Sequence, residues 1–341
     1  MAKLDLYEAT KHRLEKYALF STDTIHAIAS VAKKQSEYTS YEDFFSEIGI
    51  PRPTMYLSGR NKGVPVVDIL PKKGKTEGVL VLHLPMVNPL DENQLYHVAT
   101  VAAAQPKYRI IAFGNPSGRP YNYKQQNMSI WNLFKIAFTN NQQPLVATEL
   151  EYLRSHAIKD AHFVGYSYGA HKALIEASYA EKGTLKAITL IDPVAHPRGV
   201  RQLIHDFRNT FQPLGEYVNR TGIETYFQAR KETAKTNHHN DALRRPISIA
   251  IGFILKRKDF IGSLEKVFKK HPRIAATVAW GSVGELGNDA HMKVSMHRLK
   301  YEAHENIHAL RLEGDKHAFA NDIHLYAAVI REAVSRADKT K

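Results

Sequence analysis

The pentapeptide at residues 165–169 reads G-Y-S-Y-G, and of the whole sequence it is the part best suited to chemistry. A serine that attacks a carbonyl must stand clear of the backbone, which a sharp turn from a strand into a helix achieves. An apolar run at residues 162–164 precedes the serine, and a helix-forming run at residues 170–175 follows it. The two glycines leave room where strand and helix approach each other. The pattern therefore predicts Ser167 as a nucleophile.

A second pattern, H-E-x-x-H at residues 304–308, matches the signature of zinc proteases. That chemistry requires a helix, because a helix brings two histidines four residues apart to the same face beside one metal ion. The apolar positions at residues 307–312 run into the turn residue Gly314 and favour a strand instead. In a strand the two histidines lie too far apart to chelate one ion. We therefore predict no metal site at this motif.

The elements around Ser167 follow a regular alternation of strands and helices. Strands are expected at residues 78–84, 109–113, 161–166 and 185–191, with helices at 91–104, 145–156 and 169–180. The alternation resumes with strands at 274–280 and 307–312 and a closing helix at 320–337. Such an order predicts a mostly parallel, doubly wound α/β sheet, and the continuous apolar character of the first strand favours burial on both faces.

Three regions are expected from the changes in pattern. Residues 1–50 are predicted to form an N-terminal helical extension, and residues 51–196 and 273–341 an α/β core that begins with strands near 54–59 and 64–70. Residues 197–272 offer amphipathic helical patterns and no convincing strand, so they are predicted to form a helical cap.

The chain of 341 residues carries a formal net charge of +13, and the predicted cap holds 15 Lys or Arg against 7 Asp or Glu. This field favours an anionic partner, but no nucleic-acid-binding motif accompanies it, so we expect no nucleic acid partner. The absence of cysteine excludes a disulfide scaffold, a thiolate metal site and a cysteine nucleophile. No apolar stretch is long enough to span a membrane, and the first twenty residues are charged throughout, so a cytoplasmic protein is expected.

The elbow and the alternation around it resemble the α/β-hydrolase superfamily over about residues 54–335. The family forms its oxyanion hole after an earlier strand, commonly at a His-Gly pair. The matching segment here, residues 82–86, reads L-H-L-P-M, so Leu84 replaces the glycine and Pro85 has no amide hydrogen. The resemblance implies the amide of Tyr168 as one donor and that of Leu84 or Met86 as the other.

The resemblance also implies a histidine base after the last strand, and His317 stands there. Most relatives carry the acid after the penultimate strand, which favours Glu285 or the later Asp289. A minority, similar to pancreatic lipases, carry it after the strand that follows the elbow, which favours Asp192. The sequence leaves the three acids open.

The expected activity is hydrolysis of a small carboxylic ester through an acyl-enzyme formed on Ser167, with no cofactor and no metal. Thioesterases, acyltransferases and peptidases use the same machinery, so they remain alternatives. The departures from the usual oxyanion and acid pattern leave another alternative, a catalytically silent binding protein that recruits an anionic partner through the basic cap.

Overall fold

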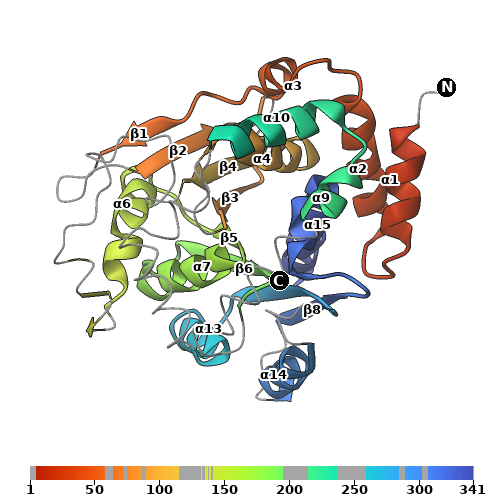
Figure 1. Cartoon of the computed structure of the whole chain (residues 1–341). Helices are drawn as coiled ribbons and strands as arrows, with labels where there is room; N and C mark the ends of the chain where they lie inside the picture. Colours follow the sequence, from red (N-terminus) through yellow and green to blue (C-terminus); the bar gives the residue numbers. More distant parts are fainter. Residues whose placement is uncertain are drawn as a thin grey trace.

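The computed structural model describes residues 5–57, 64–72, 75–85, 90–114, 141–194, 214–236, 259–283, 289–301 and 306–340, together with five residues between 132 and 139. A sheet of eight strands in the order β1-β2-β4-β3-β5-β6-β7-β8 crosses the molecule (Figure 1). The strands are β1 (Thr54–Tyr56), β2 (Val64–Ile69), β3 (Gly78–His83), β4 (Tyr108–Phe113), β5 (Ala161–Tyr166), β6 (Leu185–Ile191), β7 (Ala275–Gly281) and β8 (Ile307–Leu312).

The strands from β4 through β3 to β8 pair in parallel, and β1 and β2 add an antiparallel edge. Every residue of β5 and of β7 is buried. This burial explains the uninterrupted apolar runs, because a parallel strand covered by helices on both faces has no polar side. The predicted doubly wound α/β sheet is confirmed.

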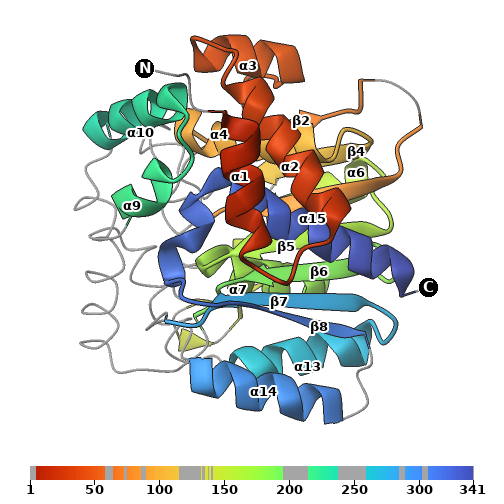
Figure 2. The ribbon, with the colours of Figure 1, turned by 90° about the vertical axis from the view of Figure 1, so that its right-hand side faces the viewer.

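Helices cover both faces of the sheet, and Figure 2 shows the two layers. One face packs against α1 (Leu6–Glu15), α2 (Thr22–Gln35), α3 (Tyr41–Ile48), α4 (Glu92–Ala104) and α15 (Ile323–Lys339). The other packs against α6 (Ala147–Ser155), α7 (Tyr168–Tyr179), α13 (Phe260–Lys270) and α14 (Asp289–Tyr301). The shorter elements are η2 (Gln143–Leu145), α9 (Leu214–Asn219), α10 (Glu224–Thr236) and η3 (His317–Asn321).

The helices of the first fifty residues are built into the core. Ile28 of α2 is fully buried in the same apolar cluster as α15. Glu332 of α15 accepts hydrogen bonds at 2.9–3.0 Å from the amide and hydroxyl of Ser21, which caps α2, and from the hydroxyl of Thr24. The extension is therefore fixed to α15, the helix that follows the predicted base.

Residues 197–272, expected to form a cap, contain helices of two kinds. Helices α9 and α10 lie beside η3 and α4, whereas α13 packs against α7 with Phe260, Leu264 and Val267 buried in the core below the sheet. The amphipathic pattern of α13 has the three- and four-residue spacing that either location requires. Residues 197–213 and 237–258 of this region lie outside the described residues. Among the helices that the structure describes, none is long and apolar enough to cross a bilayer.

Candidate active site

Ser167 stands at a sharp turn between β5 and α7. Its φ of 55° and ψ of −118° lie in a backbone region that residues other than glycine rarely adopt. A Cβ on Gly165 would lie 2.2 Å from the carbonyl oxygen of Gly169, and a Cβ on Gly169 would lie 2.2 Å from that of His83. Both positions therefore require glycine, because a side chain at either would separate the strand ends from the helix. The local pattern G-Y-S-Y-G carries this constraint, which is why the sequence alone indicates the turn.

The side chain of Ser167 meets a histidine and, through it, a carboxylate. The Oγ of Ser167 lies 3.0 Å from Nε2 of His317, the first residue of η3. On the other side of the imidazole, Nδ1 lies 3.2 Å from Oδ2 of Asp192. Ser167 and His317 are buried and Asp192 is fully so. The three side chains form one continuous series from hydroxyl to imidazole to carboxylate.

Asp192 reaches His317 because β6 ends beside the elbow. The amide of Ser167 donates to the carbonyl of Ile191 at 2.8 Å, and the amide of Asp192 donates to the carbonyl of Ala279 at 2.6 Å. The turn after β5 is thus bonded to the end of β6, and the turn after β6 is bonded to the end of β7. Asp192 has a φ of 42°, which is positive like that of Ser167.

The other two acids suggested by the sequence differ in their surroundings. Asp289, at the start of α14, accepts hydrogen bonds from Nε1 of Trp280 at 2.9 Å and from Nε of Arg311 at 2.7 Å. The hydrogen bond from Arg311 lowers the pKa of Asp289 far below its usual range. Asp289 therefore forms an ion pair with Arg311. Glu285 lies outside the described residues.

The candidate oxyanion donors lie at the same end of the sheet. Tyr168 is the first residue of α7, where backbone amides have no partner within the helix and the helix dipole favours negative charge. Leu84 follows β3 directly, and the contact of Gly169 with the carbonyls of His83 and Leu84 brings that strand end against the elbow. Met86 lies outside the described residues.

The turn that leads to His317 is held from three directions. Asp315 accepts from the hydroxyl of Tyr17 in the segment after α1 at 2.5 Å and from Arg220 in the segment after α9 at 2.9 Å. The amide of Lys316 donates to the hydroxyl of Tyr217 at 2.8 Å. The hydroxyl of Tyr166 also donates to the carbonyl of His317 at 3.1 Å.

Arg13 of α1 adds a charge next to the same turn. Its guanidinium lies 3.3 Å from Oδ1 of Asp322, which is fully buried and caps α15. Burial raises the pKa of Asp322, and the nearby charge of Arg13 opposes that rise. Sequence reasoning missed Arg13, Tyr17 and Arg220, because no local pattern indicates that two distant helices meet at one turn.

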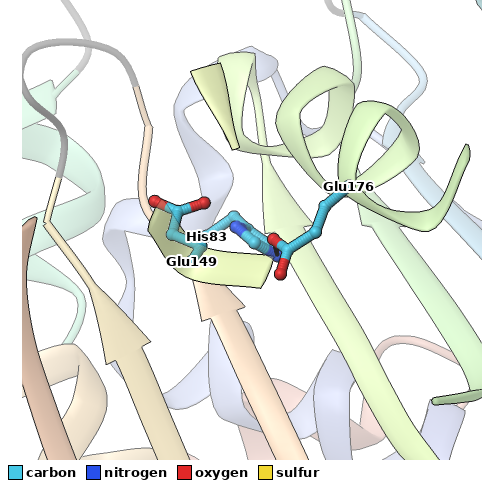
Figure 3. A group of neighbouring side chains, drawn as sticks. All are labelled: His83, Glu149 and Glu176. Atoms are coloured by element: carbon cyan, nitrogen blue, oxygen red, sulfur yellow. Dashed lines mark ion pairs between the residues drawn. The ribbon is translucent and has the colours of Figure 1, made fainter. Parts of the chain in front are cut away.

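Potential metal ligands fall in two places. His308 of the H-E-x-x-H motif lies in β8 opposite Thr277, with its Nε2 3.4 Å from Oγ1 of Thr340, and residues 304–305 lie outside the described residues. Elsewhere, in the part of the chain that the structure describes, ligand atoms of His83, Glu149 and Glu176 all lie within 4.8 Å of one another (Figure 3).

Comparison with known proteins finds likeness in structure. No protein-family model and no curated protein matches the chain. An esterase from Exiguobacterium antarcticum is similar at a TM-score of 0.52 and 14% identity, over 84% of this chain and 99% of that one. An esterase from Pyrococcus furiosus is similar at a TM-score of 0.53 and 11% identity, over 86% of this chain and 93% of that one. A thioesterase domain from the curacin biosynthetic pathway is similar at a TM-score of 0.52 and 13% identity, over 83% of this chain and 99% of that one. With this sheet order and this elbow, the chain has the fold of the α/β-hydrolase superfamily.

Proposed function

We propose that the protein is a serine hydrolase of small carboxylic esters, with Ser167 as nucleophile, His317 as base and Asp192 as the acid. The observation that carries the proposal is the series of contacts at 3.0 Å and 3.2 Å that joins the three side chains beside a strained strand-to-helix turn. A serine hydroxyl becomes a useful nucleophile only when a base accepts its proton, and the 3.0 Å contact between Ser167 Oγ and His317 Nε2 supports this role for His317.

In the proposed reaction, Ser167 Oγ bonds to the ester carbonyl carbon while its proton passes to Nε2 of His317. Asp192 keeps the hydrogen of the neutral imidazole on Nδ1 and stabilises the positive charge that forms. The tetrahedral intermediate then expels the alcohol, which takes the proton from Nε2. Water, activated by the same nitrogen, releases the acid and restores Ser167.

The negative oxygen of each tetrahedral intermediate needs hydrogen-bond donors in place before it forms. We assign this role to the amides of Tyr168 and Leu84, on the two segments that Gly169 holds together. The part of residues 197–272 that holds α9 and α10 is proposed to cover the substrate site, because Tyr217 of α9 and Arg220 directly after it contact the turn before His317.

A panel of p-nitrophenyl esters with acyl chains of rising length, together with matched thioesters, tests the proposal. Ser167→Ala and His317→Ala are each expected to lower kcat by about 10⁴-fold or more while the protein stays folded. Ser178→Ala is the matched control, because Ser178 lies on the same helix and its hydroxyl only donates to the carbonyl of Ile175.

Preference for thioesters would move the proposal to a thioesterase, the activity named for one of the similar structures. Wild-type turnover in Ser167→Ala would reject Ser167 as the nucleophile. No turnover of any substrate by the wild type would favour the binding protein that recruits an anionic partner through residues 197–272.

A further inference from the structure

Four polar side chains are enclosed beneath the elbow. His83 is the last residue of β3, Glu149 lies on α6, and Lys172 and Glu176 lie one turn apart on α7. None of them is more than 2% exposed. Figure 3 shows the carboxyl group of Glu176 beside the imidazole of His83, with Glu149 on the opposite side. The rings of Phe113 and Phe163 pack against His83 at centroid distances of 6.5 Å and 5.9 Å, so the surroundings are apolar.

The contacts join the four side chains into one unit. The ammonium of Lys172 binds the carboxylate of Glu149, and Oε2 of Glu176 lies 3.0 Å from Nε2 of His83. One oxygen of the Glu149 carboxyl group also lies within 4.8 Å of one oxygen of the Glu176 carboxyl group. Two ionised carboxylates this close together in a buried site would repel each other, so a proton on one of the two stabilises the pair.

The surroundings decide where that proton resides. Burial raises the pKa of Glu176 well above its ordinary value, and the charge of Glu149 raises it further. Burial raises the pKa of Glu149 as well, but the charge of Lys172 acts in the opposite direction. Burial lowers the pKa of His83 well below its ordinary value, and Lys172 lowers it further, so the imidazole is neutral. Tyr168, whose pKa burial raises, is a further titratable group near Glu149.

We propose that Lys172, Glu149, Glu176 and His83 form a neutral positioning cluster, with Glu149 ionised and Glu176 protonated, that fixes the end of β3 against α7. His83 immediately precedes Leu84, and Lys172 lies one turn after Tyr168. The cluster therefore sets the distance between the two amides of the proposed oxyanion hole, and this consequence rests on the proposed function. No member is assigned a contact with substrate, so the four are positioning residues.

The three potential ligands, one imidazole and two carboxyl groups within 4.8 Å of one another, also resemble a site for a divalent cation. However, the ammonium of Lys172 already neutralises Glu149, and a proton on Glu176 completes the charge balance. A divalent ion would add positive charge to a buried group that is balanced without it. The ammonium of Lys172 therefore takes the place that a metal cation would have in this cluster.

Glutamine substitutions distinguish the two glutamates, because glutamine mimics a protonated carboxyl group. Glu149→Gln removes the carboxylate that binds the buried ammonium of Lys172 and is expected to lower Tm by about 5 °C or more at every pH from 5 to 8. The double variant Glu149→Gln with Lys172→Met removes both charges and is expected to recover most of that loss.

Glu176→Gln is expected to behave differently. The pKa of Glu176 is higher in the folded than in the unfolded protein, so its stabilising effect is complete below the unfolded pKa of about 4.3 and declines as pH rises. Glutamine has no such dependence. Relative to the wild type, Glu176→Gln should therefore gain about 2 °C in Tm per pH unit from pH 5 to 8.

These Tm measurements need no enzymatic activity, so they test the cluster even if the proposed function is wrong. A Tm difference between Glu176→Gln and the wild type that does not change with pH would overturn the assignment. A constant Tm loss in Glu176→Gln together with a pH-dependent gain in Glu149→Gln would also overturn it. One equivalent of metal in the purified wild type, lost in both variants, would replace the cluster with a metal site.

The positioning role has its own readout in kinetics. Glu149→Gln is expected to lower kcat for the best ester at least tenfold with KM changed less than threefold, because the oxyanion donors act mainly in the transition state. Glu176→Gln should keep kcat within about twofold. Equal kcat in all variants, despite the expected Tm changes, would reject the positioning role and keep only a structural one.

Discussion

Ser167 and Asp192 share an unusual property at the scale of single residues. Both have positive φ angles, 55° and 42°, although neither is glycine. Such conformations cost of order 1–3 kcal/mol each and persist where the surroundings hold them. Here the amide of each residue bonds to a carbonyl of the neighbouring strand. The strain is the expected consequence of aiming both side chains at His317.

Ser167→Gly should therefore stabilise the protein while it removes the proposed nucleophile. Glycine adopts a positive φ without steric cost, so the free energy of unfolding should exceed that of Ser167→Ala by about 1 kcal/mol. Urea unfolding of the two variants measures the difference. Ser178→Gly, inside α7, is the control and should lose about 1 kcal/mol relative to Ser178→Ala. A Ser167→Gly variant less stable than Ser167→Ala would show that the turn is not strained.

Asp192→Asn and Asp289→Asn separate the two described candidates for the acid. Asparagine at 192 no longer stabilises the imidazolium or selects its tautomer, so kcat should fall by about 10⁴-fold. Asparagine at 289 weakens the ion pair with Arg311 and should leave kcat within a few fold of the wild type. Ester kinetics on both variants decide between them, and the opposite ranking would contradict the assignment of Asp192.

The sequence predicts Ser167 from five consecutive residues, because the requirements of the turn are local. The acid cannot be chosen in this way. Asp192, Glu285 and Asp289 each follow a strand of the same sheet, and the choice depends on which strand end lies beside His317. That depends on tertiary contacts such as the pairing of Asp192 with Ala279, which no spacing in the sequence encodes.

At the scale of elements, α1 and its following turn support the segment that carries His317. Arg13 pairs with buried Asp322 on one side of that segment, and Tyr17 donates to Asp315 on the other. Residues 1–50 were predicted to be helical from their pattern, and α1, α2 and α3 lie there. The contacts of Arg13 and Tyr17 with Asp322 and Asp315, on either side of η3, were not predictable, because they join residues about 300 positions apart.

Arg13→Ala should destabilise the protein by about 3–5 kcal/mol, because it leaves the carboxylate of Asp322 buried without its cation. It should also lower kcat more than it changes KM, since Asp322 caps the helix that follows His317. Lys11→Ala on the same helix is the control, because Lys11 only pairs with the exposed Glu8 and should change stability by less than about 1 kcal/mol. Equal stability of the two variants would show that α1 does not support this segment.

At the scale of the whole molecule, buried histidines make stability sensitive to acid. Burial lowers the pKa of His97 to about 4 and that of His162 to about 3. In the unfolded chain both take up a proton near pH 6.5, so their stabilising effect is complete above that pH and is lost as pH falls toward the folded values.

Between pH 6 and 4 each of these histidines should reduce the free energy of unfolding by about 1.4 kcal/mol per pH unit. Urea unfolding of the wild type and of His162→Gln over this range measures the slope, which should be smaller in the variant. His12→Gln, at an exposed position, is the control and should keep the wild-type slope. An unchanged slope in His162→Gln would show that His162 is not held neutral by burial.

The most direct test of the account is the reaction of the purified protein with a fluorophosphonate, followed by intact mass. This reagent forms a stable bond with a serine that an adjacent base activates. The account predicts one adduct on the wild type, none on Ser167→Ala and strongly slowed labelling of His317→Ala. An unlabelled wild type, or a Ser167→Ala variant labelled as fast as the wild type, would contradict Ser167 as the activated nucleophile.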